Sequence, residues 1–218
     1  MSHPDDEILG CGGTVASFIK KGDEVNILIL GEGITSRDEN RDQKKRNIEM
    51  NSLREDIHRA NEIIGTTNLF FYDFPDNRFD TVPLLDIVKT IEKIKAIIKP
   101  TIIFTHFKND LNIDHRITYN AVITATRPIS DETVKEIYCF EVLSSTEWNY
   151  PLSFSPNTFF DVSQTIEIKI NALKEYKNEL RDYPHPRSLK GVMLNAENWG
   201  LKVGLGYAEA FECARVIR

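Results

Sequence analysis

The first residues of the chain bring together side chains that can bind a metal ion or move a proton. One imidazole and three carboxylates occur in residues 3–7, which read His-Pro-Asp-Asp-Glu, and glycines follow at positions 10, 12 and 13. Glycine lets a backbone turn tightly or approach a ligand closely. Zinc accepts histidine nitrogen and carboxylate oxygen at about 2.0–2.2 Å, and catalytic zinc sites leave one position for water. Taken alone, this segment fits an acidic turn that caps a helix equally well.

A second group of metal-capable side chains follows an apolar run much later in the chain. The run is Thr-Ile-Ile-Phe-Thr at residues 101–105. Two such groups that end at the same edge of a sheet can share one cation, and this favours a metal site over a simple helix cap. The side chains of the second group are His106, Asp110, Asn112, Asp114 and His115.

In this order, and with this long gap between them, the two groups resemble the PIG-L or LmbE-like family of zinc-dependent N-acetylglucosaminyl deacetylases. That family is marked by His-Pro-Asp-Asp-Glu with a glycine-rich sequel and by a later Asp-His pair, here residues 3–7 and 114–115. The resemblance continues to Tyr-Ala-Glu-Ala-Phe at residues 207–211. It implies a Rossmann-like, three-layer α/β sandwich of the LmbE type and a small N-acetylated amino sugar as substrate.

The resemblance also implies a metal site, residue by residue. His3, Asp6 and His115 would bind one zinc ion per chain, with water in the fourth place. Asp5 would be the general base, because a neighbouring carboxylate can take the proton of a zinc-bound water whose pKa has fallen to about 7. A site of nitrogen and oxygen ligands also accepts other divalent metals, so zinc is a preference.

Supporting catalytic roles are predicted for the second group. Asp114 is expected either to orient a ligand histidine through a hydrogen bond or to cap the helix that follows. Many relatives carry a histidine where this chain has Asn112, and a neutral amide cannot donate a proton near pH 7. The general acid is then another residue, with His106 and His185 as candidates, or Asp5 acts twice.

Four residues are predicted to contact the substrate. Arg54 stands where the family tends to place a substrate-contacting arginine, and a guanidinium suits sugar hydroxyls or a phosphate. A solvated helix face is the competing interpretation of Arg54. Asn77 and Arg78 follow an expected strand, and His185 lies in a turn stiffened by prolines. Glu7 is expected to brace the glycine-rich turn rather than to bind metal.

Strand and helix patterns alternate along the chain. Short apolar runs of β-branched residues predict buried parallel strands, and their alternation with helices predicts a mainly parallel sheet covered on both faces. In such sheets ligands bind beyond the carboxyl ends of the strands, which is where both groups lie. The expected strands are 24–30, 69–72, 101–105, 136–143 and 158–162, and the expected helices are 10–21, 47–64, 81–99, 114–126 and 163–180.

The start of the chain departs from the family pattern. Only Met1 and Ser2 precede His3, whereas relatives have an apolar strand there. We therefore expect either a truncated or mis-assigned start, or a sheet that lacks a strand which is usually central. The whole chain, residues 1–218, is otherwise predicted to form a single deacetylase domain.

Composition argues against several classes of protein. A net charge of −6, from 27 basic and 33 acidic residues, is unlike the basic face of a nucleic-acid binder. Apolar stretches fall far short of the ~20 residues that cross a bilayer, and no signal segment opens the sequence. Three scattered cysteines predict free thiols and a cytoplasmic protein. Assembly into a homo-oligomer is left open.

The predicted function is hydrolytic removal of the acetyl group from an N-acetylated amino sugar, or a conjugate of one, of the N-acetylglucosamine type. One alternative is an amidase that acts on a bulkier sugar-thiol or antibiotic conjugate. A degenerate sugar- or metal-binding protein is the other, suggested by Asn112 and by the short start. The intact base and metal ligands argue against degeneration.

Overall fold

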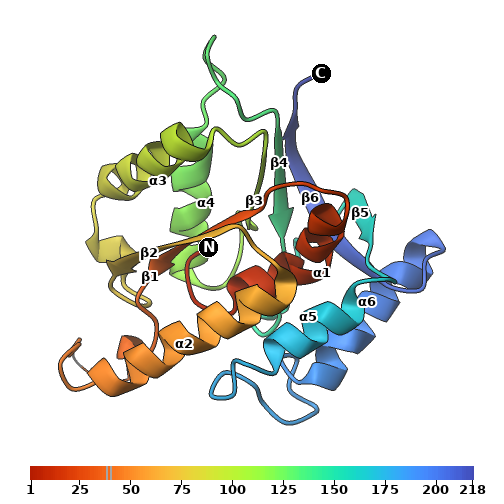
Figure 1. Ribbon diagram of the computed structural model, residues 1–218, viewed down its shortest axis with the longest axis horizontal. Coiled ribbons are helices and arrows are strands. Elements are labelled where there is room, and N and C mark those ends of the chain that lie inside the picture. The colour runs from red at the N-terminus through yellow and green to blue at the C-terminus, as the bar shows by residue number, and fades with distance from the viewer. Residues whose placement is uncertain (38, 40) are drawn as a thin grey trace.

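Six strands in the described part of the chain form two separate sheets (Figure 1). The computed structural model describes residues 1–37, 39 and 41–218. The smaller sheet contains β1 (Asn26–Gly31) and β2 (Asn68–Phe74), which run parallel to one another. Both strands are short apolar runs, and they lie within two residues of the positions that the sequence predicts.

The larger sheet is mixed. Its order is β3-β4-β6-β5, formed by β3 (Ile102–His106), β4 (Glu136–Phe140), β6 (Ala208–Val216) and β5 (Thr158–Asp161). β3 and β4 are parallel, whereas β6 is antiparallel to both of its neighbours. The prediction of an α/β fold is confirmed. The prediction of one mainly parallel, Rossmann-like sheet is wrong, because the sheet is split and its larger part is mixed.

The direction of β6 follows from where the chain enters it. Phe211, early in β6, is paired with Phe140, the last residue of β4. The chain therefore enters β6 at the end of the sheet where β4 finishes, and it can only return antiparallel. No crossover helix is needed for such a strand, so the strand–helix alternation that predicts a parallel sheet does not apply to this last segment.

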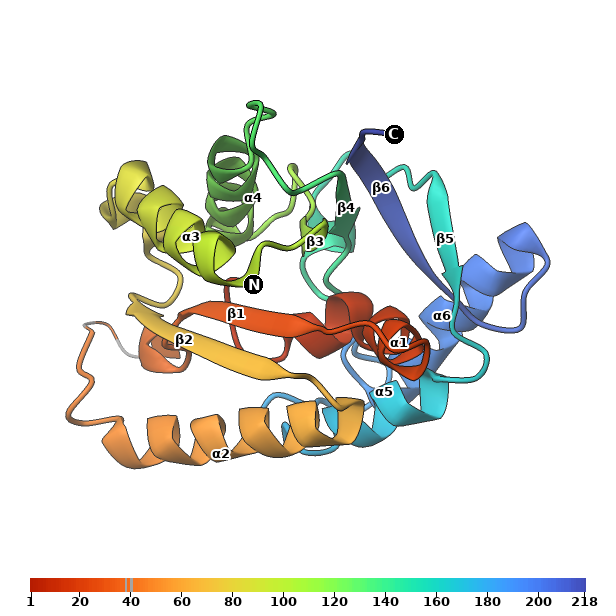
Figure 2. The same ribbon diagram turned by 45° about the horizontal axis from the view of Figure 1, so that its top comes forward.

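Helices cover both sides of the strands. In Figure 2, α2 and α5 lie on one side of β1 and β2, and α3 and α4 lie on the other. Among the helices of the described residues, none is both long enough and apolar enough to cross a membrane. The six α-helices described are α1 (Asp6–Lys20), α2 (Asn47–Ile64), α3 (Leu84–Ile98), α4 (Ile113–Ala125), α5 (Ile166–Leu173) and α6 (Leu189–Val203).

Helix α1 begins earlier than predicted and is kinked. It starts at Asp6, within the first polar group, and its backbone leaves helical geometry at Cys11. Beside the kink, a Cβ atom added to Gly10 would stand 2.2 Å from the ring of Phe140. The glycine-rich sequel therefore lets α1 press against β4, and this contact fixes the start of the helix relative to the sheet.

The first two residues lie alongside β1. The N-terminal amine of Met1 donates to the carbonyl of Leu28 at 2.5 Å, and Leu30 N–H donates to the carbonyl of Met1 at 3.0 Å. Gly31 N–H then donates to the carbonyl of Ser2 at 2.8 Å. This short segment occupies the break between the two sheets and delivers His3 to the end of β1.

Candidate metal centre

Three side chains from distant parts of the chain converge at the ends of β1 and β3. His3 follows the segment paired with β1, Asp6 is the first residue of α1, and His115 lies in the first turn of α4. The side chain of His3 is 13% exposed, whereas those of Asp6 and His115 are each 3% exposed. The cluster is thus buried, with solvent reaching it mainly at His3.

The spacing of the three atoms fits a tetrahedral metal site. His3 Nδ1 lies 3.3 Å from His115 Nε2 and 3.5 Å from Asp6 Oδ2, and the last two atoms are 3.4 Å apart. In a tetrahedron the distance between ligands is about 1.63 times the bond length, so bonds of about 2.0–2.1 Å give edges of about 3.3–3.4 Å. These residues form a possible metal site, and their donor atoms match those that zinc prefers.

Both histidines are oriented by carboxylates on their far sides. His3 Nε2 lies 2.9 Å from Asp114 Oδ2, and His115 Nδ1 lies 3.0 Å from Asp110 Oδ1. Such contacts place the proton on the outer nitrogen and leave the inner nitrogen free to bind a metal. Asp114 is itself held by Phe79 N–H, which donates to its Oδ1 at 2.9 Å. These close carboxylate contacts orient both imidazoles toward the shared centre.

The carboxylates shift the pKa values of the cluster strongly. Burial lowers the pKa of His3, but Asp114 and Asp6 outweigh it and raise the pKa to about 10. Burial also lowers the pKa of His115, but Asp6 and Asp110 outweigh this effect and raise the pKa above its usual value. Burial would raise the pKa of Asp6, but the imidazoles of His115 and His106 hold it well below its usual range. The pocket thus favours positive charge at its centre.

Asp5 stands next to this cluster with a strained backbone. Its φ of 84° lies in the left-handed region, at the N-cap of α1; an aspartate occupies that region more readily than most residues, though at some cost. Arg187 Nη1 donates to Asp5 Oδ2 at 3.0 Å, and Arg187 Nε donates to Ser144 Oγ at 2.7 Å. Burial nevertheless raises the pKa of Asp5 to about 8, against the lowering effect of Arg187.

Arg187 is the residue of this site that sequence reasoning missed. It follows His185 in the proline-stiffened turn before α6, and its backbone N–H donates to His185 Nδ1 at 3.1 Å. The ring of His185 packs edge-on against Trp148. The Pro-His-Pro-Arg sequence predicts a site role for His185, but the side chain that contacts Asp5 is that of Arg187, two positions later.

Asn112 and Asn77 are brought together at the rim of the cluster. Asn112 Nδ2 donates to Asn77 Oδ1 at 2.7 Å, and Asn112 Oδ1 accepts from Asp114 N–H at 2.8 Å. Asn112 is thereby the N-cap of α4. The alternative in which Asp114 caps this helix is wrong, because Asp114 is directed at His3 instead.

His106 forms the base of the cluster. It is fully buried, its ring stacks on that of His115 with centroids 4.0 Å apart, and its Nε2 accepts from Ser2 N–H at 2.9 Å. Burial and the neighbouring His115 hold its pKa well below the usual range. A neutral imidazole that accepts a backbone hydrogen bond has no proton to offer on that nitrogen.

Two predicted substrate residues have other partners. Arg54, on α2, forms an exposed ion pair with Asp73 at 2.7 Å. Arg78 Nη2 donates to the carbonyl of Glu39 at 2.9 Å. Among the described residues, neither arginine contacts the proposed metal ligands, so the structure does not bring the two arginines into the cluster.

Glu7 follows the proposed ligand Asp6 in α1, and its carboxylate contacts residues outside the cluster. Tyr176 and Asn61 both donate hydrogen bonds to its Oε1, the latter at 3.1 Å. Burial raises the pKa of Glu7 to about 7. It joins α1 to α2 and to the segment after α5, a structural arrangement that agrees with the bracing role expected for it.

Two imidazoles and a carboxylate at metal-ligand spacing, beside a further carboxylate, on an α/β fold, define a candidate metallohydrolase. The family described as GlcNAc-PI de-N-acetylase, PIG-L, matches residues 1–126, more than half of the chain. The chain therefore belongs to the PIG-L family, and the predicted resemblance is confirmed. It is also 27% identical over 183 residues to the uncharacterized deacetylase YaiS of Escherichia coli (strain K12), across 81% of this chain and 88% of that protein.

Solved structures share the fold at low identity. The N,N'-diacetylchitobiose deacetylase from Pyrococcus horikoshii superposes with a TM-score of 0.77 at 18% identity, covering 98% of this chain and 81% of that one. GalB, the 4-carboxy-2-hydroxymuconate hydratase from Pseudomonas putida KT2440, gives a TM-score of 0.74 at 18% identity, with 100% and 95% covered. The same fold thus carries two different reactions, and the reaction must be argued from the site.

Proposed function

We propose that this protein is a metal-dependent hydrolase that removes the acetyl group from an N-acetylated amino sugar, or a conjugate of one, of the N-acetylglucosamine type. The observation that carries the proposal is the triangle formed by His3, Asp6 and His115, with Asp5 beside it. We assign zinc, one ion per chain, because the distances between the three ligand atoms, 3.3–3.5 Å, fit its tetrahedral bonds. Other divalent metals with similar preferences remain compatible with these ligands.

Asp5 is assigned the role of general base. When bound, the metal would supply a water of lowered pKa and would polarise the amide carbonyl. Asp5 would accept the proton of the attacking water and return it to the leaving amine, because neither Asn112 nor His106 fits the role of acid. Asn112 is a neutral amide whose oxygen and nitrogen both have partners, and His106 is buried with a lowered pKa.

The remaining polar residues are assigned to holding the reactants. Asp114 and Asp110 would keep the two ligand histidines in the tautomer that binds metal. Arg187 would hold the Asp5 carboxylate toward the attacking water through their contact at 3.0 Å. Asn77 and His185 would offer hydrogen bonds to a sugar at the rim, whereas Arg54 and Arg78 would first have to leave their present partners.

The substrate class rests on the family and on its relatives. The family description is a de-N-acetylase of an N-acetylglucosamine lipid, and one structural neighbour acts on a diacetylated disaccharide. An N-acetyl group on a sugar is common to both. We further propose that the chain acts as one domain, and that its three free cysteines reflect a reducing, cytoplasmic environment.

Acetate release tests this proposal. The protein would be offered N-acetylglucosamine, its phosphate and lipid conjugates and N,N'-diacetylchitobiose, as prepared, after chelation and after zinc is restored. We expect release from at least one substrate, loss on chelation and recovery with zinc. Release that persists after complete metal removal would contradict metal dependence. Stoichiometric metal binding without release from any substrate would favour a bulkier amide or a binding role.

A further inference from the structure

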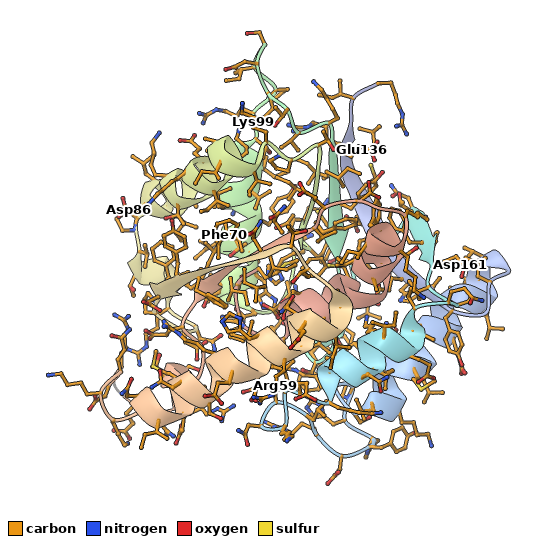
Figure 3. The ribbon with its side chains drawn as sticks, in the orientation of Figure 1. Arg59, Phe70, Asp86, Lys99, Glu136 and Asp161 are labelled. Carbon is orange, nitrogen blue, oxygen red and sulfur yellow. The ribbon has the colours of Figure 1, made fainter. Side chains whose placement is uncertain are left out.

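Trp148 is an exposed aromatic residue that has no role in the reaction proposed above. It ends the short 3₁₀ helix Thr146–Trp148 and is 43% exposed. This helix lies in the loop between β4 and β5; Glu136, which begins β4, and Asp161, which ends β5, are labelled in Figure 3. Single apolar residues at the surface are common. Trp148 differs from them in how firmly it is held and in what holds it.

The loop that carries Trp148 is bonded to the residues behind the proposed metal ligands. The hydroxyls of Ser145 and Thr146 both donate to Asp110, the carboxylate that contacts His115. The backbone N–H of Trp148 donates to the carbonyl of Ser145 at 3.2 Å. The backbone that presents the indole is therefore tied to the metal centre.

A second segment of the chain holds the indole ring itself. Trp148 packs edge-on against the imidazole of His185, with ring centroids 5.6 Å apart and an angle of 82° between the planes. The N–H of Arg187 donates to His185 Nδ1 at 3.1 Å, and its guanidinium donates to Asp5 at 3.0 Å and to Ser144 at 2.7 Å. Two residues thus connect Trp148 with the proposed base.

Together the indole and the imidazole offer what a sugar ring binds. The C–H groups on one face of a pyranose form an apolar surface that packs against an aromatic ring, and its hydroxyls take hydrogen bonds from polar groups nearby. Because His185 Nδ1 accepts a hydrogen bond from the Arg187 N–H, the proton of the neutral imidazole lies on Nε2. That N–H can be donated to a hydroxyl of the ligand.

The separation of Trp148 from Asp5 indicates which ring would stack. The acetamido group that reacts has to reach the proposed metal ligands and Asp5. His185 and Arg187 intervene between Asp5 and Trp148 in the series of contacts. The ring at Trp148 is therefore a neighbour of the sugar that carries the reacting group.

We propose that Trp148 and His185 form a stacking subsite for a second pyranose ring, linked to the N-acetylated sugar whose acetyl group is removed. This inference rests on the proposed function, because the metal centre determines which ring reacts. The indole covers the apolar face of the second ring, and His185 Nε2 donates to one of its hydroxyls. The substrate class is then an amino sugar in glycosidic linkage to another sugar.

Kinetics of three variants of the zinc-loaded protein test the subsite, with N-acetylglucosamine and N,N'-diacetylchitobiose as substrates. Trp148→Leu removes the aromatic face and Trp148→Phe keeps a smaller one. Leu152→Ala is the matched control, because Leu152 is an apolar residue of the same loop and is 68% exposed. We expect Trp148→Leu to raise the KM for the disaccharide about tenfold, equal to about 1.4 kcal/mol, and to raise the KM for the monosaccharide less.

The other two variants separate stacking from a general effect on the loop. The lost contact is remote from the reacting bond, so the change should appear in KM and not in kcat. Trp148→Phe should recover most of the affinity for the disaccharide, and Leu152→Ala should behave as the parent does. An equal rise in KM for both sugars, an unchanged KM for the disaccharide, or equal effects of leucine and phenylalanine at position 148 would overturn the proposal.

Tryptophan fluorescence gives a readout that needs no turnover. The chain has two tryptophans, and the second, Trp199, is bonded to Glu141 at 2.6 Å. N,N'-diacetylchitobiose titrated into the zinc-loaded Asp5→Asn protein should change the emission saturably, and adding Trp148→Phe should abolish that change. A saturable change without acetate release by the parent would support the subsite and reject the proposed reaction. Acetate release without any change in emission would overturn the subsite and leave the reaction standing.

Discussion

Two buried charged clusters lie against helix α1, and they are built differently. Away from the metal centre, Lys169 pairs with Glu209 at 2.5 Å and donates to the carbonyl of Leu9 at 2.7 Å. Glu209 in turn accepts from the backbone N–H groups of Gly13 and Thr14 at 3.0 and 2.7 Å. One cation meets one anion there, and the hydrogen bonds left over hold the helix just after its kink.

The metal centre has more anions than cations. Asp6, Asp76, Asp110 and Asp114 surround the two proposed ligand histidines, and among the described residues Asp5 forms an ion pair with Arg187 alone. Buried charges in proteins are usually paired or bind metal. The contrast teaches that buried charge alone does not mark a functional site, because the Lys169–Glu209 pair is complete. A surplus of carboxylate around oriented imidazoles is what makes this cluster a candidate metal site.

Replacing His115 with alanine should have the largest effect on activity. The change removes one of three ligands, so we expect loss of bound metal and a fall in acetate release on the order of 10⁴-fold. The protein should still fold, because α1 packs on the sheet through the contact between Gly10 and Phe140 and not through the metal cluster. Metal content, circular dichroism and acetate release measure this. Retention of one metal per chain would remove His115 from the ligand set.

Asp5→Asn should separate metal binding from turnover. The amide keeps the size of the side chain but cannot accept the proton, so release should fall by roughly 10²–10⁴-fold while metal content stays at one per chain. The same two assays measure it. Activity within a few-fold of the parent would exclude Asp5 as the base.

Lys169→Met should lower the stability of the protein and leave its metal affinity almost unchanged. Removing one partner of a buried ion pair leaves Glu209 uncompensated and costs about 3–5 kcal/mol of stability. The melting temperature should fall, while the metal affinity of the remaining folded protein stays close to that of the parent. Denaturant unfolding and metal titration measure the two quantities. Large loss of metal affinity with an unchanged midpoint would show that the two clusters are not independent.

Metal affinity should rise with pH. The pKa of His3 is raised to about 10 and that of His115 is also raised, so protons compete with the metal for these two imidazoles near neutral pH. Binding must displace those protons, and affinity should increase about 10- to 100-fold per pH unit between pH 6 and 8. Calorimetry in buffers of different ionisation enthalpy counts the protons released. An affinity independent of pH would contradict the protonated state.

Arg187→Gln should produce the smallest change. Arg187 lowers the pKa of Asp5, so its loss raises that pKa further and moves the acid limb of the activity profile to higher pH. We expect about a tenfold loss of release at pH 7 and a smaller loss at pH 9. Arg181→Gln is a matched control, because the Arg181 guanidinium donates to the backbone carbonyls of Asn178 and Leu180 and does not contact Asp5 among the described residues. An equal loss at both pH values would argue for a purely structural role.

The metal cluster could be predicted because its signal is local. Two short polar segments, each next to an apolar run or a helix start, contain all three proposed ligands and Asp114, and they meet where β1 and β3 end. Arg187 could not be found in this way. It reaches Asp5 from 182 positions away, out of an irregular turn whose spacing follows no helical or strand period.

The fold was predictable to a similar extent. The apolar runs of β1, β2 and β3 have a clear pattern, and helix α2 has the predicted bounds. Helix α6 was not predicted. Several of its apolar residues, such as Leu194 and Leu201, are exposed, so its apolar residues do not follow a clear amphipathic helical period. The split between β1 and β3 depends on how strands are ordered in space, which a run of residues does not specify.

The left-handed backbone of Asp5 has a consequence for how this protein can evolve. Holding a residue other than glycine in that region costs on the order of 1–2 kcal/mol, and Asp5→Gly would recover part of it while abolishing the proposed base. Selection for thermostability alone would therefore push this position away from aspartate. Libraries screened only for soluble expression should accumulate glycine or asparagine there, so the identity of residue 5 reports whether catalysis was under selection.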